Sequence, residues 1–416
     1  MPLWLALSAS PFSINAAVFR AAVAVRIVTP DPLLPVSGGV GPSHPVNRKE
    51  GDLTVRALVL DDGTTRIAIV GADFLGFPAV LGKKVRARIP SVPPENILIG
   101  STHTHSAPDC YGFLEEKGGF AADLKYLDMV CRRMAESVNE AVAQLQPASL
   151  KIATGEAQGK IAYNYYAEQL YDPRCHVIQA VGLNGQPLAT LVNYAIHPEV
   201  LGPKQGILSP DLVGPLYARI QAKGGGTALF MNSAQGGMVT ADCRGPDGHD
   251  IQTWAECERI GQLLADEALR LVAPAPVQPN PGLFCRAVRV TFPVESPELK
   301  AVMTMSPLGY DAASDSISTQ LNLLNIGTAQ VLTIPGEALP NIGYYLKRKM
   351  RGQHNLLFGL TNDAFGYILT REDWGSFKRY QYITRTCLGE RTGQIFVDEA
   401  LKLVEQAPRP NLVHAP

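Results

Sequence analysis

The sequence has 416 residues, of which 46% are hydrophobic and 18% are charged, and its 37 Lys and Arg nearly balance its 38 Asp and Glu. This balance gives no electrostatic reason to expect a nucleic-acid partner. The apolar content excludes a disordered chain. No uninterrupted apolar run reaches the roughly 18–20 residues that a membrane-spanning helix needs. The length predicts about two domains or one large α/β domain.

The 7 cysteines form no CxxC pair, which argues against a cysteine zinc site or a thioredoxin-type motif. An odd number leaves at least one thiol unpaired, and we expect mostly reduced, buried cysteines. Residues 1–20 contain a short apolar stretch but no Lys or Arg before Arg20. This segment fits a degraded signal peptide or a misplaced start site, so the sequence does not decide between export and a cytoplasmic location.

The first half of the chain predicts short strands that end in polar loops. Residues 54–60 and 66–71 flank an Asp-Asp-Gly turn, which is typical of a β-hairpin. Residues 97–100 predict a buried strand, and 123–145 carry apolar residues at helical spacing. Two further strands are expected at 187–196 and 228–231.

The second half continues this alternation of strands and helices. A helix is predicted at 254–272, followed by a stiff proline-rich linker that allows a subdomain break near 274–282. The elements expected after it are a strand at 284–292, one or two strands within 321–334, a helix at 338–350, a strand at 356–360 and a helix at 393–405. The pattern predicts a mixed α/β fold with a central sheet flanked by helices, in which ligands bind at the carboxyl ends of strands.

His103 and His105 stand two residues apart, directly after the strand predicted at 97–100. In extended backbone such residues point the same way, so both imidazoles can reach one cavity. One interpretation is a zinc ligand beside a proton carrier; the other is two solvated histidines of a polar loop. His197 ends a predicted strand and is either a structural histidine or part of the same rim.

Glu337 lies between a predicted strand and a predicted helix. A carboxylate there caps the helix N-terminus or binds a cation. Two histidines and one carboxylate with an open position recur as the ligands of catalytic zinc. Because His103, His197 and Glu337 come from distant segments, their spacing does not establish that they meet.

The ordered motifs at these strand ends resemble the catalytic domain of the neutral/alkaline (non-lysosomal) ceramidase family. The resemblance extends from about residue 18 to residue 405. It is carried by 101–108 (STHTHSAP), 195–198 (AIHP), 209–214 (SPDLVG), 232–236 (NSAQG), 335–337 (PGE) and 361–367 (TNDAFGY). The ordered set is much more specific than any single segment, and it implies a ceramidase-like catalytic domain over 21–410.

The family hydrolyses N-acyl-sphingosine with a zinc ion. By position, the resemblance implies His105 as the catalytic histidine that contacts the substrate or the zinc-bound water. The zinc ligands that it implies are His103, His197, Glu337 and Tyr380, with Tyr382 as the alternative tyrosine.

The sequence departs from the family around the serine to which a catalytic or substrate-contacting role is assigned. Val239 stands at the serine position and Gly237 at an aspartate position, and Asn164-Tyr165-Tyr166 stands where the family has an arginine after an asparagine. We expect the chain to lack the C-terminal immunoglobulin-like domain of full-length members. We therefore expect a retained metal site beside an altered set of substrate-binding residues, namely Asn164, Gly236, Gly237 and Thr240.

The sequence thus predicts a zinc-dependent hydrolase that cleaves an amide or ester bond of a small-molecule or lipid-like acyl substrate. Two alternatives stay open: a true neutral ceramidase, and a non-catalytic protein that binds a metal or ligand in the same cleft. The chain has no Gly-x-Ser-x-Gly elbow, which disfavours a serine mechanism of the α/β-hydrolase type. The oligomeric state is not predicted.

Overall fold

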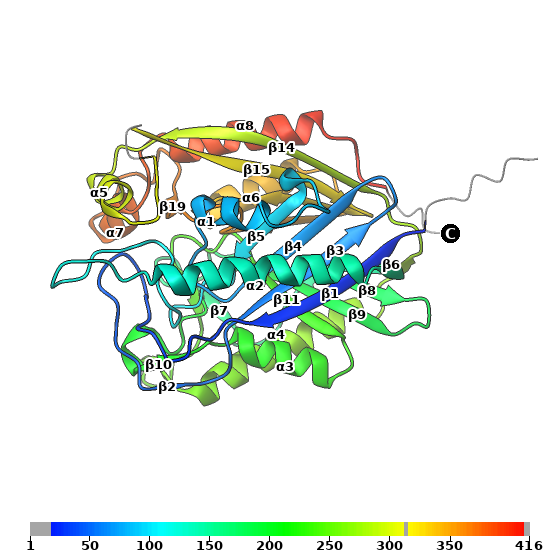
Figure 1. Ribbon diagram of the computed structural model, residues 1–416, viewed down its shortest axis with the longest axis horizontal. Helices are drawn as coiled ribbons and strands as arrows, with labels where there is room; N and C mark the ends of the chain where they lie inside the picture. The colour runs from blue at the N-terminus through cyan, green and yellow to red at the C-terminus, as the bar shows by residue number, and fades with distance from the viewer. Residues whose placement is uncertain (1–17, 312–314, 412–416) are drawn as a thin grey trace, which may run out of the picture.

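A strongly bent nine-stranded sheet forms the centre of the protein, as seen in a computed structural model that describes residues 18–311 and 315–411 (Figure 1). Residues 1–17, which include most of the predicted signal-like segment, lie outside the described residues. The strand order is β11-β9-β8-β6-β1-β3-β4-β5, and β13 pairs with β6. The strands are β1 (Arg20–Ile27), β3 (Thr54–Asp61), β4 (Arg66–Ala72), β5 (Ile97–Ser101), β6 (Gln146–Glu156), β8 (Arg174–Gly182), β9 (Pro187–Tyr194), β11 (Thr227–Asn232) and β13 (Val277–Gln278).

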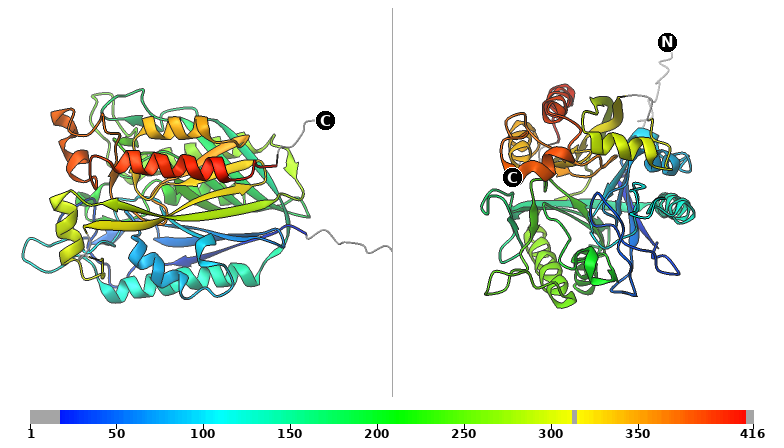
Figure 2. Two further views of the ribbon diagram at one scale, coloured as in Figure 1. Left: turned by 90° about the horizontal axis from the view of Figure 1, so that it is seen from above. Right: turned by 90° about the vertical axis from the view of Figure 1, so that its left-hand side faces the viewer.

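The sheet consists of two halves that share little backbone pairing. β1 and β6 are joined by two residue pairs, Arg20 with Pro147 and Ala21 with Gln146. The two halves diverge where β1 meets β6, and they lie at an angle to each other in the right-hand view of Figure 2. β11, at the far edge of one half, folds back against β4 and β5 of the other half.

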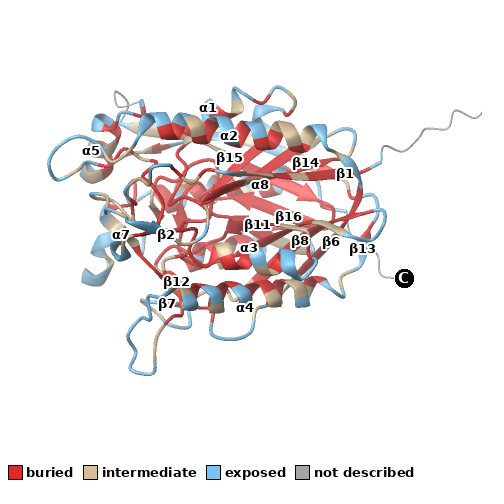
Figure 3. Ribbon diagram, turned by 60° about the horizontal axis from the view of Figure 1, so that its bottom comes forward, coloured by how far each residue is buried: buried red, intermediate tan, exposed pale blue. Residues whose placement is uncertain are grey.

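Helices cover one face of each half. α1 (Ala79–Arg86) and α2 (Leu124–Ala143) pack on β1, β3, β4 and β5. α3 (Val213–Ala222) and α4 (Trp254–Val272) pack on β8, β9 and β11. The inner faces of α2 and α4 are buried and their outer faces exposed (Figure 3). None of the helices in the described ranges is long and apolar enough to cross a membrane.

A second sheet packs on the other face of the central sheet. Its order is β14 (Leu283–Pro293), β15 (Ser316–Ile326), β16 (Ala329–Thr333) and β18 (His354–Phe358). The alternation of side chains along β3 shows the layering. Ala57 and Val59 face α2, whereas Leu58 and Leu60 face the second sheet. α6 (Pro340–Lys349) and α8 (Thr392–Gln406) close the outer side, which gives four layers in the order helix, sheet, sheet, helix.

Short elements surround one end of these layers. They are β2 (Arg48–Lys49), β7 (Ala162–Asn164), β10 (Ile207–Leu208), β12 (Val239–Ala241), β17 (Glu337–Ala338), β19 (Tyr367–Ile368), α5 (Pro297–Met305) and α7 (Gln381–Arg385), with 3-10 turns η1 (Pro94–Asn96), η2 (Pro203–Gln205) and η3 (Lys378–Tyr380). The predicted mixed α/β class is confirmed, and the predicted proline-rich linker contributes β13 to the central sheet. All 7 cysteines are free.

The carboxyl ends of β5, β11 and β18 meet at this same end of the molecule. Backbone hydrogen bonds join their loops, from Ser101 to Leu360 and from Gly359 to Asn232. The parallel pairing of β4 with β5, β9 with β11, and β16 with β18 directs several strand ends to one place. The loops that carry the predicted site residues therefore gather at one edge of both sheets.

The close approach of β4 and β11 depends on Gly71. A methyl group on this residue would lie 2.9 Å from the carbonyl oxygen of Phe230. We expect Gly71→Ala to lower the free energy of unfolding by about 1–3 kcal/mol, as overpacked sites do. The control Leu183→Ala, at a side chain that is 77% exposed, should change it by less than about 0.5 kcal/mol. Thermal or denaturant unfolding measures both, and equal midpoints for the two variants would contradict the steric argument.

Candidate active site

The loop after β5 positions His103 through an unusual backbone conformation. Its φ of 77° lies in the left-handed region, which is uncommon outside glycine. The conformation is held by a hydrogen bond from its N–H to the Phe74 carbonyl. Its Nδ1 lies 2.6 Å from the Leu75 carbonyl oxygen. Because a carbonyl only accepts, Nδ1 carries the proton and Nε2 presents its lone pair to the interior.

His197 is oriented in the same way from the loop after β9. Its backbone N–H and its Nδ1 both lie 2.8 Å from the Val239 carbonyl oxygen. The ring is fully buried, and Nε2 again faces inward. Metal-binding histidines commonly show this arrangement, in which the outer ring nitrogen donates to a carbonyl and fixes the tautomer.

Glu337 opens β17 and brings a carboxylate to the two imidazoles. Its Oε2 lies 3.1 Å from His197 Nε2 and 3.4 Å from His103 Nε2. The carbonyl of Glu337 packs directly against Gly236, where a methyl group would come within 2.1 Å of that oxygen. The absence of a side chain at Gly236 therefore lets the Glu337 segment approach the cluster.

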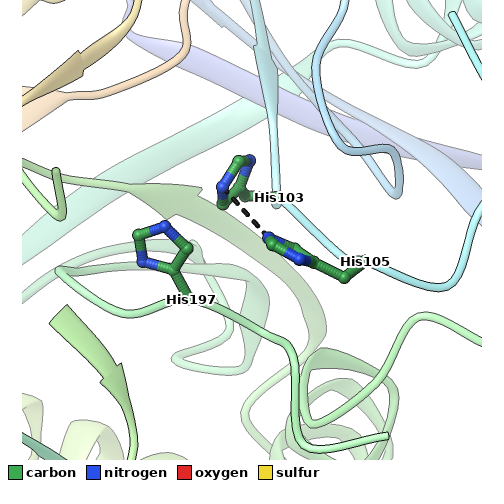
Figure 4. A group of neighbouring side chains, drawn as sticks. All are labelled: His103, His105 and His197. Carbon is green, nitrogen blue, oxygen red and sulfur yellow. Dashed lines mark hydrogen bonds between the residues drawn. The ribbon is translucent and has the colours of Figure 1, made fainter. Parts of the chain in front are cut away.

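His105 completes a group of three imidazoles (Figure 4). Its Nε2 lies 3.3 Å from His103 Nε2, and one ring nitrogen from each of His103, His105 and His197 lies within 4.8 Å of the others. All three side chains are buried. The described residues thus contain a buried three-histidine cluster that could hold a metal ion, with Glu337 beside it.

The distances between these atoms fit a metal site. In tetrahedral zinc sites with ligands about 2.0–2.1 Å from the ion, neighbouring ligand atoms lie roughly 3.3 Å apart. Glu337 Oε2 lies at this spacing from both imidazoles, 3.1 Å from His197 Nε2 and 3.4 Å from His103 Nε2. Lone pairs on imidazole nitrogens that converge at this spacing repel each other unless a cation or a proton lies between them.

The electrostatics of the cluster are those of a desolvated site. Burial lowers the pKa of His105 to about 3, so this imidazole is neutral. Burial opposes ionisation of Glu337, but His103 and His197 outweigh it and hold the pKa of the carboxyl well below its usual range. Burial likewise disfavours the charged form of His197, but contact with Glu337 raises its pKa overall. A carboxylate among three imidazoles is suited to a cation.

A cavity opens beside the cluster, and His103, His105 and Glu337 form part of its wall. Most of the remaining lining is apolar or aromatic, and includes Leu75, Tyr111, Phe113, Leu299, Val302, Met303, Tyr310, Ile317, Phe365, Tyr367, Tyr382 and Leu388. This lining comes from both halves of the chain. Such a wall suits a hydrocarbon group next to a polar reaction centre.

The two candidate tyrosines occupy different places. Tyr382 lines the cavity, and its pKa is raised to about 12 by burial and by the charge of Glu337. Tyr380 packs instead against Tyr166 and Phe377, with ring centroids 5.0 and 5.3 Å apart. Among the described residues, Tyr382 is thus the member of the pair that shares the cavity with Glu337.

The residues predicted to contact substrate are not among those that line the cavity. Asn164 organises its own loop by donating to the Leu170 carbonyl. Gly236 and Gly237 pack against Glu337 and Leu339. The Thr240 hydroxyl donates to Glu199 Oε1 at 2.6 Å.

Glu199 is a site residue that the sequence analysis did not find. Its Oε2 lies 3.4 Å from His105 Nδ1. The only hint in the sequence was that Glu199 lies two residues after His197, in the loop that follows β9. A Pro-Glu pair after a strand is common in loops, so the sequence alone did not single it out.

Asn232 holds the two histidine-bearing loops together. Its side-chain amide donates to the carbonyls of Thr102 and Ile196, at 3.0 and 2.7 Å, and its oxygen accepts from the backbone of Ile196 and Ser233. The residue is completely buried at the end of β11. One amide therefore fixes the separation between the loops of His103 and His197.

Comparisons with known proteins agree with this architecture. No protein-family model matches the chain. The sequence is 27% identical to neutral ceramidase B of Dictyostelium discoideum over 182 residues, and 24% identical to a neutral ceramidase of Pseudomonas aeruginosa over 209 residues. These segments cover 37% and 44% of this chain, but they cover only 25% and 31% of the two curated relatives.

The fold comparison covers nearly the whole chain. The crystal structure of neutral ceramidase from Pseudomonas aeruginosa superposes with a TM-score of 0.75 over 97% of this chain and 77% of that one, at 18% identity. A structure described as ceramidase complexed with C2 gives a TM-score of 0.74. The protein has a ceramidase-like α/β fold. It is a distant homologue of the neutral ceramidases, and the resemblance seen in its motifs is confirmed.

The bridging role of Asn232 can be tested by substitution. Asn232→Ala leaves two buried carbonyls without their donor, and we expect a loss of about 1–3 kcal/mol for each unsatisfied group. Asn232→Asp should be worse, because a carboxylate oxygen would face the same carbonyls. Denaturant unfolding measures the loss, with Asn139→Ala as the control, since that amide donates to Arg88 at the surface. A stable Asn232→Asp variant would contradict this role.

Proposed function

We propose that this protein is a zinc-dependent hydrolase that cleaves an amide or ester bond of an N-acyl-type, lipid-like substrate. The observation that carries the proposal is the convergence of His103, His197 and Glu337 beside an apolar cavity that His103 and Glu337 line. The names of the homologues support the same class, since both curated relatives are neutral ceramidases.

The proposed zinc ligands are His103, His197 and Glu337, with Tyr382 as the fourth. Tyr382 is preferred over Tyr380 because it lines the cavity that Glu337 also lines. The donor set of two imidazoles and a carboxylate suits zinc. A zinc ion in such a site supplies an activated water and polarises a substrate carbonyl.

His105 is proposed as the proton carrier. Its Nε2 lies 3.3 Å from His103 Nε2, in a position from which it can accept a proton from the attacking water. The same nitrogen then returns the proton to the leaving amine or alcohol of the substrate. The apolar lining binds the acyl group and excludes bulk water, which strengthens the electrostatic interactions at the reaction centre.

The substrate is proposed to differ from ceramide. Val239 stands at the position of the family serine, and it is completely buried in the short β7–β12 ladder opposite Asn164. An aliphatic side chain there offers no hydroxyl to a substrate. The proposed chemistry needs no serine nucleophile, because the reaction relies on an activated water and a proton carrier.

Metal content tests the ligand assignment. The purified protein should contain about one zinc ion per chain, as a catalytic zinc site requires. His103→Ala and His197→Ala should each lose it, whereas the exposed-residue control His249→Ala should keep it. His105→Ala should keep zinc while hydrolysis falls about 10²–10⁴-fold. Full zinc in both His103→Ala and His197→Ala would overturn the site, and loss of zinc in His105→Ala would make His105 a ligand instead of a proton carrier.

A hydrolysis screen tests the substrate class. We expect chelator-sensitive cleavage of an N-acyl amide or ester that is faster than cleavage of ceramide, and its loss in Glu337→Gln. Ceramide turned over as fast as the best substrate would identify a true ceramidase. No turnover of any amide, ester or lactone by zinc-loaded protein would instead indicate a non-catalytic binding protein.

A further inference from the structure

The imidazole of His105 is contacted on both sides. Its Nε2 faces His103 Nε2 at 3.3 Å, and its Nδ1 faces Glu199 Oε2 at 3.4 Å. His103 and His197 use backbone carbonyls, of Leu75 and Val239, for the equivalent contact at Nδ1. His105 therefore differs from the other two histidines in having a carboxylate at this position.

The carboxylate of Glu199 is itself held in place. Its Oε1 accepts from the Thr240 hydroxyl at 2.6 Å, and its backbone N–H bonds to the His197 carbonyl. Thr240 lies on β12, directly after Val239, whose carbonyl accepts from His197 Nδ1. β12 thus orients His197 directly and His105 through Glu199.

We propose that Glu199 is a positioning residue for His105, with Thr240 as its anchor. The carboxylate oxygen keeps the proton on Nδ1 and leaves the Nε2 lone pair facing His103 and Glu337. This tautomer is the one that a proton acceptor at the reaction centre requires. The inference rests on the proposed function only in the role given to His105, because the tautomer is a property of the protein itself.

The tautomer can be read without any substrate. In zinc-loaded protein labelled with ¹⁵N-histidine, the NMR resonances that disappear in His105→Ala belong to His105. We expect these resonances to show a protonated Nδ1 and an unprotonated Nε2. Glu199→Ala should abolish that pattern, while Glu199→Gln, which keeps an oxygen acceptor, should restore it at least in part. An unchanged tautomer in Glu199→Ala, or one that Gln fails to restore, would overturn the proposal.

A double-mutant cycle tests by enzyme kinetics whether Glu199 acts through His105. Second-layer partners of this kind typically affect activity about 10–100-fold, so Glu199→Ala should lower kcat by that amount with KM and zinc content nearly unchanged. Thr240→Val, which keeps the shape of the side chain, should have a smaller effect in the same direction. In a His105→Ala background, Glu199→Ala should have almost no further effect, because residues in one contact network are not additive.

Together, the NMR experiment and the double-mutant cycle distinguish failure of this inference from failure of the proposed function. Multiplicative effects of Glu199→Ala and His105→Ala would mean that Glu199 does not act through His105, which contradicts the positioning role. If wild-type protein hydrolyses none of the substrates, the proposed function fails. The ¹⁵N spectra of Glu199→Ala then still decide whether Glu199 positions His105.

Discussion

The site is organised around a buried negative charge. Glu337 loses its hydration in the wall of the cavity, and a desolvated carboxylate is costly unless a positive partner compensates it. Two imidazoles provide contacts at 3.1 and 3.4 Å. Their Nδ1 protons are committed to backbone carbonyls, so each Nε2 is left to face the carboxylate. This one requirement explains why three loops from distant parts of the chain are held together so tightly.

Three buried local features of the fold hold these loops in place. The amide of Asn232 joins the loops after β5 and β9, and the left-handed backbone of His103 turns its ring toward the cluster. Gly236 allows the Glu337 backbone to come close, where a side chain would collide. Each of these features acts on the loops that carry the cluster.

The strongest local patterns were readable from the sequence. The β3–β4 hairpin has an Asp-Gly turn, and α4 has the predicted bounds because its apolar face and Thr253 cap are unambiguous. β1, β6 and β8 were missed because polar residues such as Arg26, Lys151 and Gln179 interrupt them, and only long-range pairing defines them. The positions of His103, His197 and Glu337 next to predicted strands were compatible with a shared edge of the sheet, but their spacing did not establish that the three residues meet. The partners of Glu199 and Thr240 could not be predicted, because those contacts depend on how β12 lies beside the β9 loop. The choice between Tyr380 and Tyr382 depends on the turn at η3, which the spacing of residues does not fix.

The order of the contributing residues along the chain has a consequence for biosynthesis. The imidazoles at 103 and 197 emerge from the ribosome well before the carboxylate at 337, and the aromatic wall at 382 follows later still. A nascent chain thus exposes nitrogen donors that have neither their charged partner nor their hydrophobic cover. The cluster can take its final geometry only after the segment that carries the carboxylate at 337 folds against the two earlier loops, so assembly of the cluster depends on folding of the second half of the chain.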